Sequence, residues 1–256
     1  MKVHYADNYI INPQHRVTVD LVGAGGTGSQ MLQSLARIDY ALYKLGHPGL
    51  SVRVYDNDIV TEANVGRQLF SPNDVGLYKS DVLVTRINAF YGLDWKSEAR
   101  IYDGKDMKPS NITISCVDNV ASRIRIGNYL RDKKTNSGGY DMHRKYYWLD
   151  FGNQTDRGQV VLGSIGEIKQ PKKSKYETVP HLKTVDELFD LKEINEEDSG
   201  PSCSLAEALR KQDLFINSAL CQLGSALLWK LFSEGCVSAN GAYLNLSTMT
   251  SVPMKL

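Results

Sequence analysis

A glycine-rich stretch that follows a short apolar run constrains the fold of this chain more than any other feature. The run is VTVDLV at residues 17–22, and it leads directly into GAGGTGS. A glycine cluster after a strand makes a tight turn, lets backbone N–H groups approach a phosphate, and lets the next helix pack against the sheet. We therefore predict a phosphate-binding loop, formed by Gly23, Gly25, Gly26 and Gly28.

The residues that follow supply the context that such a loop requires. Apolar residues at helical spacing predict a helix over 27–45, and SVRVYD at 51–56 predicts a second strand. Asp56 ends this strand, where a carboxylate can bind both hydroxyls of a ribose. A strand–turn–helix–strand unit with such an acid predicts an adenine nucleotide. On these features alone NAD or FAD would be the commonest ligand, and a glycine turn that binds nothing is the remaining alternative.

Helical and strand patterns continue to alternate through the next hundred residues. We expect helices at 80–91 and 120–133, and strands at 98–102, 111–118, 146–152 and 158–166. This alternation predicts a mostly parallel sheet with right-handed crossovers. The last two strands are joined by a short polar turn and predict an antiparallel edge. The expected fold class is α/β, with a Rossmann-like, mostly parallel sheet flanked by helices and an antiparallel extension. Asp20 lies inside the first strand, and the sequence names no partner for its carboxylate.

The whole chain, 1–256, is expected to form a single domain. Residues 16–165 would be its nucleotide-binding core. Residues 167–201 change from basic and proline-containing to acidic, and we interpret them as a mobile loop or lid in which TVDELFDL is helical. Residues 202–256 would form a long helix, with a break near Asp213, and a terminal hairpin.

Composition excludes some classes of protein. The net charge is +1, whereas a nucleic-acid-binding protein usually carries a basic excess, so a nucleic-acid partner is not expected. No apolar run approaches the roughly 20 residues of a membrane span, and the first residues lack the apolar core of a secretory signal. A cytoplasmic location is therefore predicted. The four cysteines form no C-x-x-C pair, so we expect no structural zinc.

Polar residues beyond Asp56 favour a triphosphate over a dinucleotide. NVGRQ at 64–68 supplies Asn64, Arg67 and Gln68, and Lys79 follows a short loop later. A dinucleotide enzyme does not need two cations and an amide here, whereas a leaving pyrophosphate needs its charge neutralised.

A second acid is expected on the same side of the sheet as the glycine loop. CVDN at 116–119 places Asp118 at the carboxyl end of a later strand, where ligands of open α/β sheets bind. A carboxylate there is well placed to hold Mg²⁺ that bridges phosphates.

Taken in order, these five features resemble the ThiF/MoeB/HesA superfamily of adenylating enzymes. They are GAGGTGS, Asp56, N-x-x-R-Q at 64–68, Lys79 and Asp118. The resemblance covers 16–165 well and 203–232 loosely. The charged loop and the PSCSLAEAL segment look most like the ThiF-family member of the bacterial PRTRC gene system.

The resemblance implies a role for each matching residue and a single adenylation domain. The glycines would hold ATP, Asp56 would bind its ribose, and Arg67 and Lys79 would bind the phosphates with support from Asn64 and Gln68. Asp118 would hold Mg²⁺. The implied reaction is attack of the C-terminal carboxylate of a small ubiquitin-like or sulfur-carrier protein on the α-phosphorus of ATP.

The chain departs from the family pattern near its beginning and in its extent. Many members form a homodimer, which the resemblance implies here, and donate an arginine from an N-terminal helix to the partner subunit. The first fourteen residues contain no arginine, and Arg16 abuts the first strand. The second catalytic domain of the eukaryotic activating enzymes is not evident.

Cys203 differs from the other three cysteines. It directly precedes Ser204, which forms a capping-box pattern with Glu207, and a thiol beside a helix N-terminus is stabilised as the thiolate. Some members of the resembled family carry a cysteine in this region that forms a thioester or an acyl-disulfide with the carrier. We predict Cys203 as a candidate nucleophile, and an inert loop thiol is the alternative.

Three other functions remain open at this stage. The first is adenylation of a small-molecule or tRNA-linked carboxylate. An NAD-dependent oxidoreductase is the second, although the sequence shows neither a catalytic acid–base pair nor a substrate domain for it. The third is a scaffold that retains the fold without catalysis, against which the intact set of Arg67, Lys79 and Asp118 argues.

Overall fold

A computed structural model describes residues 1–132, 143–191 and 212–256. Its main sheet has eight strands in the order β11-β10-β7-β6-β5-β2-β3-β4. The parallel strands are β2 (Val17–Val22), β3 (Leu50–Tyr55), β4 (Lys96–Glu98), β5 (Ile112–Ser115) and β6 (Tyr147–Asn153). The antiparallel strands that continue from β6 are β7 (Arg157–Ser164), β10 (Ala239–Asn245) and β11 (Thr250–Lys255). The predicted fold class is confirmed, including its antiparallel extension.

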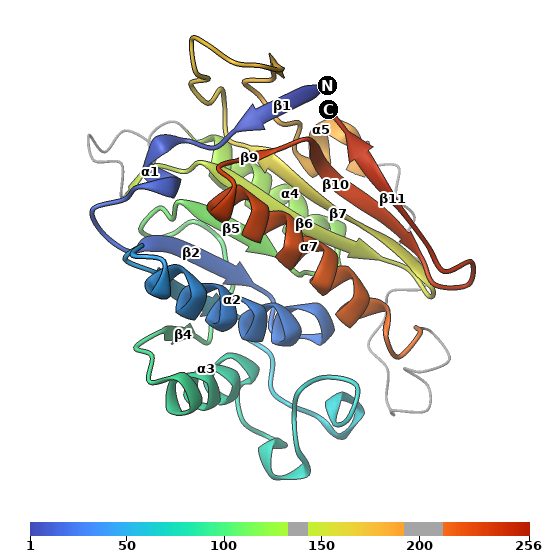
Figure 1. The fold of residues 1–256 in the computed structure, drawn as a ribbon. Helices are drawn as coiled ribbons and strands as arrows, with labels where there is room; N and C mark the ends of the chain where they lie inside the picture. Colours follow the sequence, from blue (N-terminus) through green and yellow to red (C-terminus); the bar gives the residue numbers. More distant parts are fainter. Residues whose placement is uncertain (133–142, 192–211) are drawn as a thin grey trace.

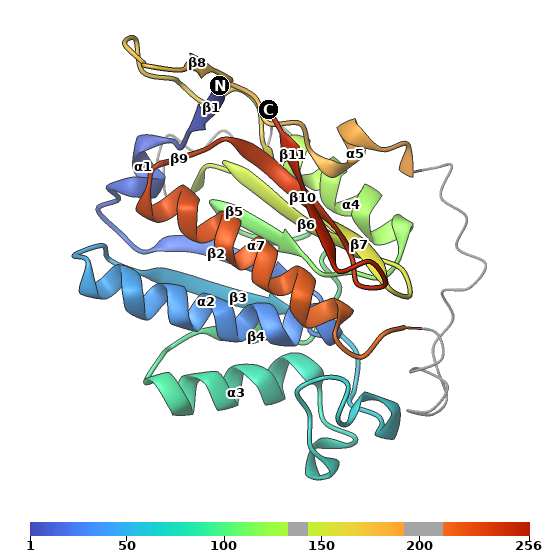
Figure 2. The same cartoon turned by 45° about the vertical axis from the view of Figure 1, so that its right-hand side comes forward.

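Helices cover both faces of this sheet (Figure 1). The long helices α2 (Gly26–Lys44) and α7 (Ile216–Ser233) lie side by side on one face, and α3 (Lys79–Tyr91) lies beside β4. On the other face lies α4 (Val120–Arg131), with the short α5 (Val185–Leu188) packed near it (Figure 2). In the described part of the chain, the buried apolar side chains accordingly form two clusters, one for each face of the sheet.

The order of the strands reverses direction between β2 and β5. From β2 the chain proceeds outward through β3 to β4, whereas β5 and β6 lie on the other side of β2. Neighbouring last residues are in register, with Val22 opposite both Tyr55 and Ser115. In open α/β sheets a ligand crevice forms at such a reversal, beyond the carboxyl ends of the strands. The loops after β2, β3 and β5 therefore meet at one place.

A smaller sheet was not expected from the sequence. It has the order β8-β1-β9, formed by β1 (Lys2–Tyr5), β8 (Glu177–Thr178) and β9 (Cys236–Val237). Strands of two residues carry no readable periodicity, because only pairing with distant segments stabilises them. Close to β1 lies the four-residue helix α1 (Asn8–Ile11), which Asp7 caps by accepting the N–H of Tyr9.

The segments predicted beyond residue 165 can be followed in part. Within 167–191, β8 pairs with β1, Ile168 and Leu182 are buried, and Thr184 and Glu187 form the expected capping box at α5. Residues 192–201, the remaining part of the predicted lid, lie outside the described residues. Asp213 accepts the N–H of Phe215 just before α7 begins, where a break was expected.

Within the described parts of the chain, no helix combines the length and the apolar character that crossing a membrane requires.

Candidate nucleotide site

The glycine turn after β2 has the shape that its sequence predicts. Gly23 has φ +94°, and a Cβ on it would stand 2.6 Å from the carbonyl oxygen of Cys116. A Cβ on Gly28 would stand 1.8 Å from the carbonyl oxygen of Gly23, so a side chain there would separate α2 from the turn. The N–H of Ser29 donates to Gly25 O at 3.0 Å, which leaves the N–H groups before it outside the helical ladder. These groups can bind an anion.

Asp56 closes the turn from the neighbouring strand. Its Oδ2 accepts the N–H of Ala24 at 2.6 Å, and its Oδ1 accepts the N–H of Asp58 at 2.8 Å. Burial raises the pKa of Asp56, while these two hydrogen bonds oppose the rise. A carboxylate has about four lone-pair sites, so both oxygens can still accept ribose hydroxyls.

A cavity of about 1330 Å³ opens over this turn. Five of the predicted nucleotide and catalytic side chains line it together with the turn itself: Asp56, Arg67, Gln68, Lys79 and Asp118. Among the described residues, six cationic and three acidic side chains border the space, a balance that favours a polyanionic ligand. The cavity continues over β6, β7, β10 and β11, so it is larger than the roughly 300–1,000 Å³ of a typical small-molecule pocket.

Two residues that line this cavity each have a buried polar atom without a partner among the described residues. Nε of Arg67 and Oε1 of Gln68 are both buried and form no hydrogen bond there. Burial lowers the pKa of Arg67, yet a guanidinium remains charged at any ordinary pH. A buried donor on a charged group is costly when it stays unpaired. Arg67 and Gln68 therefore bring unused hydrogen-bonding capacity to the lining of the cavity.

Lys79 begins α3 and is 8% exposed. Its Nζ lies 2.9 Å from Oδ2 of Asp58, a carboxylate that is itself 62% exposed. This ion pair orients the ammonium at the border of the cavity. The exposed partner leaves the other protons of the ammonium available to a phosphate.

Asp118 lies three residues beyond β5, at the same edge of the sheet. Its Oδ1 accepts a hydrogen bond from the side-chain Nδ2 of Asn119 at 3.1 Å. Among the described residues there is no group of three or more His, Cys, Asp or Glu side chains that could hold a metal. A single carboxylate fits Mg²⁺, because this ion is commonly bound through one or two carboxylates, substrate phosphates and water. The role of Asp118 in binding Mg²⁺ stays a prediction.

Asn64 and Gly28 do not border the described part of the cavity. Oδ1 of Asn64 accepts from both the N–H and the hydroxyl of Thr61, in a capping box around a 3₁₀ turn at Glu62–Asn64. In this structure Asn64 shapes the loop that carries Arg67. Cys203 lies outside the described residues.

Arg123, Gln212 and Asn217 are among the described side chains at the cavity that sequence reasoning missed. Arg123 on α4 donates to the carbonyl oxygens of Val117 and Phe151, both at 2.8 Å, and thereby holds the loop that carries Asp118. An arginine one turn into the helix after CVDN could have indicated this role. Gln212 and Asn217 are far along the chain from the glycine turn and from Arg67, and no local pattern marks them.

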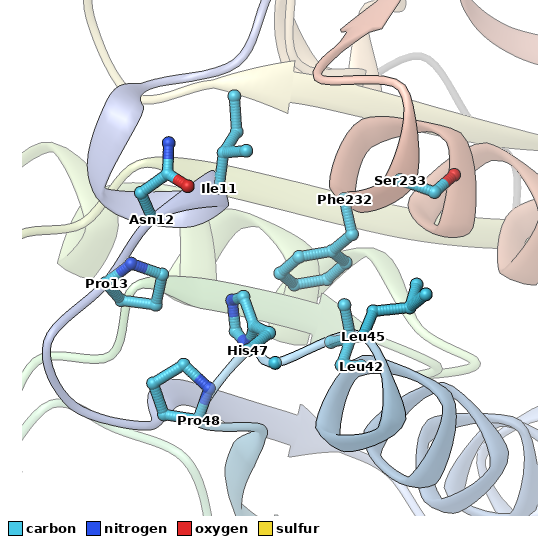
Figure 3. A pocket seen from close by; sticks show the side chains of 10 residues that line it. Ile11, Asn12, Pro13, Leu42, Leu45, His47, Pro48, Phe232 and Ser233 are labelled. Carbon is cyan, nitrogen blue, oxygen red and sulfur yellow. The ribbon is translucent and has the colours of Figure 1, made fainter.

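A second, smaller cavity of about 360 Å³ lies at the C-terminal ends of α2 and α7 (Figure 3). Because α2 rises about 1.5 Å per residue, this cavity is roughly 25 Å from the glycine turn. No predicted site residue lines it among the described residues. Nδ1 of His47 accepts from Gly49 N–H at 3.0 Å and Nε2 lies 3.1 Å from Ile10 O, which one neutral tautomer satisfies. We therefore place the candidate site at the larger cavity.

Comparisons with known proteins give the family and the fold of this chain. Over 69 residues, which are 27% of this chain, it is 39% identical to ubiquitin-activating enzyme E1 1 of Schizosaccharomyces pombe, of which it covers 6%. The crystal structure of PaaA matches 93% of the chain with a TM-score of 0.59 at 15% identity. MccB of E. coli matches the same share with a TM-score of 0.58 at 16% identity.

Structural matches at identities this low show the shared fold alone. The chain spans 64% of PaaA and 62% of MccB, so it covers less than two thirds of each of these relatives. The narrower resemblance to the PRTRC member stays a prediction. A family model for ThiF matches residues 14–210, which include the glycine turn, Arg67, Lys79 and Asp118, and this chain therefore belongs to the ThiF family.

Proposed function

We propose that this protein is an ATP-dependent adenylyltransferase that activates the C-terminal carboxylate of a small ubiquitin-like or sulfur-carrier protein. The observation that carries the proposal is Arg67, which lines one cavity with the glycine turn and Lys79 and whose buried Nε has no partner among the described residues. Arg67 and Lys79 together give the site two cationic groups, and an NAD-dependent oxidoreductase does not need both. MccB, which shares the fold, has been crystallised with ATP and with MccA.

In the proposed reaction, a carboxylate oxygen attacks the α-phosphorus of ATP. A new O–P bond forms, the bond from the α-phosphorus to its bridging oxygen breaks, and pyrophosphate leaves with the electron pair. The turn N–H groups would hold the phosphates and Asp56 the ribose. Arg67 and Lys79 would neutralise charge on the departing pyrophosphate, and Gln68 would orient it. When bound, Mg²⁺ supplies further neutralisation of the phosphate oxygens, and Asp118 is the residue that would hold it.

The extent of the cavity supports a protein substrate. Beyond the glycine turn, the β6–β7 turn borders it, and so do Tyr243 and Val252 on the terminal hairpin. Tyr243 and Val252 are 47% and 50% exposed. An extended C-terminal tail could lie along this border with its carboxylate at the glycine turn. The proposal includes a homodimer, which analytical ultracentrifugation would detect.

Isotope exchange between pyrophosphate and ATP tests the activity. A purified candidate carrier protein should stimulate exchange, and the same carrier lacking its last two residues should not. Stimulation by a small carboxylic acid instead would assign a different substrate. Tight binding of NAD without any exchange would overturn the proposed function.

Replacing Asp118 by asparagine tests the metal. The variant keeps the size of the side chain and removes its charge, so the Mg²⁺ concentration that supports half-maximal exchange should rise about tenfold or more, while ATP binding partly survives. The measurement is a Mg²⁺ titration of exchange at fixed ATP. An unchanged titration would remove Asp118 from the metal site.

Cys203→Ala separates adenylation from thioester formation. Adenylation needs no thiol, so carrier-dependent exchange should persist, whereas an enzyme–carrier adduct that dithiothreitol cleaves should disappear. Burial raises the pKa of Cys116, Cys221 and Cys236, which disfavours their thiolates. Alanine variants of these three should therefore keep the adduct, as mass spectrometry under non-reducing conditions would show. If the wild-type enzyme forms adenylate without an adduct, Cys203 is an ordinary thiol.

A further inference from the structure

We propose that Asn217 is a positioning residue for the phosphate clamp, a role that rests on the proposed function. Asn217 belongs to the first turn of α7, is only 6% exposed, and borders the cavity. It lies 150 residues beyond Arg67 and 190 beyond Thr27 in the chain, yet it connects both.

The connection is a set of three hydrogen bonds. Thr27 Oγ1 donates to Asn217 Oδ1 at 2.9 Å, and Asn217 Nδ2 donates to Gln212 Oε1 at 2.9 Å. Arg67 Nη1 donates to the same Gln212 oxygen at 2.7 Å. Both lone pairs of that oxygen are then used, which fixes the orientation of the Gln212 amide. The guanidinium is thereby tied to α7 and, through Asn217, to the first turn of α2.

These hydrogen bonds orient the guanidinium of Arg67, which the loop that carries it does not orient by itself. Arg67 forms no ion pair with an acid among the described residues, so no opposite charge there orients its guanidinium. Gln212 is a neutral acceptor, and it holds the guanidinium without neutralising it. The charge therefore stays available to a phosphate, while one of its nitrogens is held in place.

Asn217 also packs against the glycine turn. A Cβ on Gly26 would stand 2.5 Å from Asn217 Nδ2, so the amide packs directly against the turn. One side chain therefore sets the relative positions of the turn and the cation. In the proposed role the effect of Asn217 on ATP binding runs through Arg67, whereas an effect through the contact with the turn would persist without Arg67.

A double-mutant cycle on MgATP affinity, measured by isothermal titration calorimetry, tests this inference. Asn217→Ala should weaken MgATP binding about tenfold in the wild-type background, a coupling expected within one hydrogen-bond network. In the Arg67→Ala background the same change should weaken it by no more than about twofold. In the Lys79→Ala background the full loss should remain, because none of the described hydrogen bonds of Asn217 leads to Lys79. A merely structural role would produce equal losses in all three backgrounds.

Ser218→Ala is the matched control, since Ser218 lies in the same helical turn and its hydroxyl donates to Phe215 O. It should leave MgATP affinity unchanged. If Asn217→Ala fails to fold, Gln212→Ala removes the same connection from outside the helix and should show the same dependence on Arg67. If the wild-type protein binds MgATP and the losses from Asn217→Ala and Arg67→Ala simply add, the positioning role alone is overturned. If the wild-type protein binds no MgATP, the proposed function is overturned as well.

Discussion

Replacing Arg67 by alanine should reduce the rate of adenylate formation by about 10²- to 10³-fold, the range for loss of one preorganised charge stabiliser. The guanidinium lies in the cavity with a buried Nε that has no partner among the described residues, and Gln212 holds one of its other nitrogens. Without the guanidinium, the negative charge that develops on the leaving pyrophosphate would face water or an empty space instead of a cation. Carrier-dependent exchange at saturating MgATP measures the loss.

Two comparisons make this expectation specific. Lys79→Ala should give a loss of the same order. Arg37→Ala removes an exposed arginine from α2, outside the residues that border the cavity, and should have no effect on exchange. Near-normal exchange by the Arg67 variant would show that the phosphate assignment is wrong.

Replacing Arg53 by methionine should lower the free energy of unfolding by about 3–5 kcal/mol at neutral pH, the cost of leaving a buried charge without its partner. The side chain of Asp20 is fully buried in β2, and Arg53 Nε donates to its Oδ1 at 2.7 Å from the adjacent strand. Tyr102 donates to its other oxygen at 3.3 Å. A hydroxyl bond alone cannot replace the lost opposite charge.

The loss of unfolding free energy in the Arg53→Met variant should also depend on pH, and it should be larger at higher pH. Burial raises the pKa of Asp20 while Arg53 opposes the rise, so removing Arg53 raises that pKa further. The folded variant then binds a proton that the unfolded chain releases, and its stability falls as pH rises through the folded pKa. Chemical denaturation at pH 5 and pH 7.5 should therefore show a smaller loss at pH 5. Adding Asp20→Asn should remove the pH dependence, and an equal loss at both pH values would contradict the buried-charge account.

Local patterns were sufficient for the elements that form the nucleotide crevice. The strand, glycine turn, helix and second strand occur at β2, α2 and β3 within one residue of their predicted bounds. Each is contiguous in the chain, and its periodicity reports which face is buried. The glycines were recognisable for the same reason, because the close contact between Gly23 and Gly28 arises within a single short stretch of chain.

The same locality explains why Asp56, Arg67 and Lys79 could be placed at one site. Loops that follow neighbouring parallel strands must meet at one edge of the sheet, so the order of motifs along the chain was enough. Asn64 shows the limit of this reasoning. Its amide caps a turn in the described structure, because a short polar side chain can satisfy nearby backbone groups as readily as it can bind a ligand.

Partners across the fold were decided by tertiary structure alone. Asp20 and Arg53 belong to different strands and meet only because β2 and β3 pair with these residues opposite each other. Asn217 reaches Thr27 only because α7 packs beside α2 on the same face of the sheet. Sequence periodicity identifies the buried face of a helix, but hydrogen bonds between residues 190 positions apart depend on how two helices pack, which no local pattern encodes.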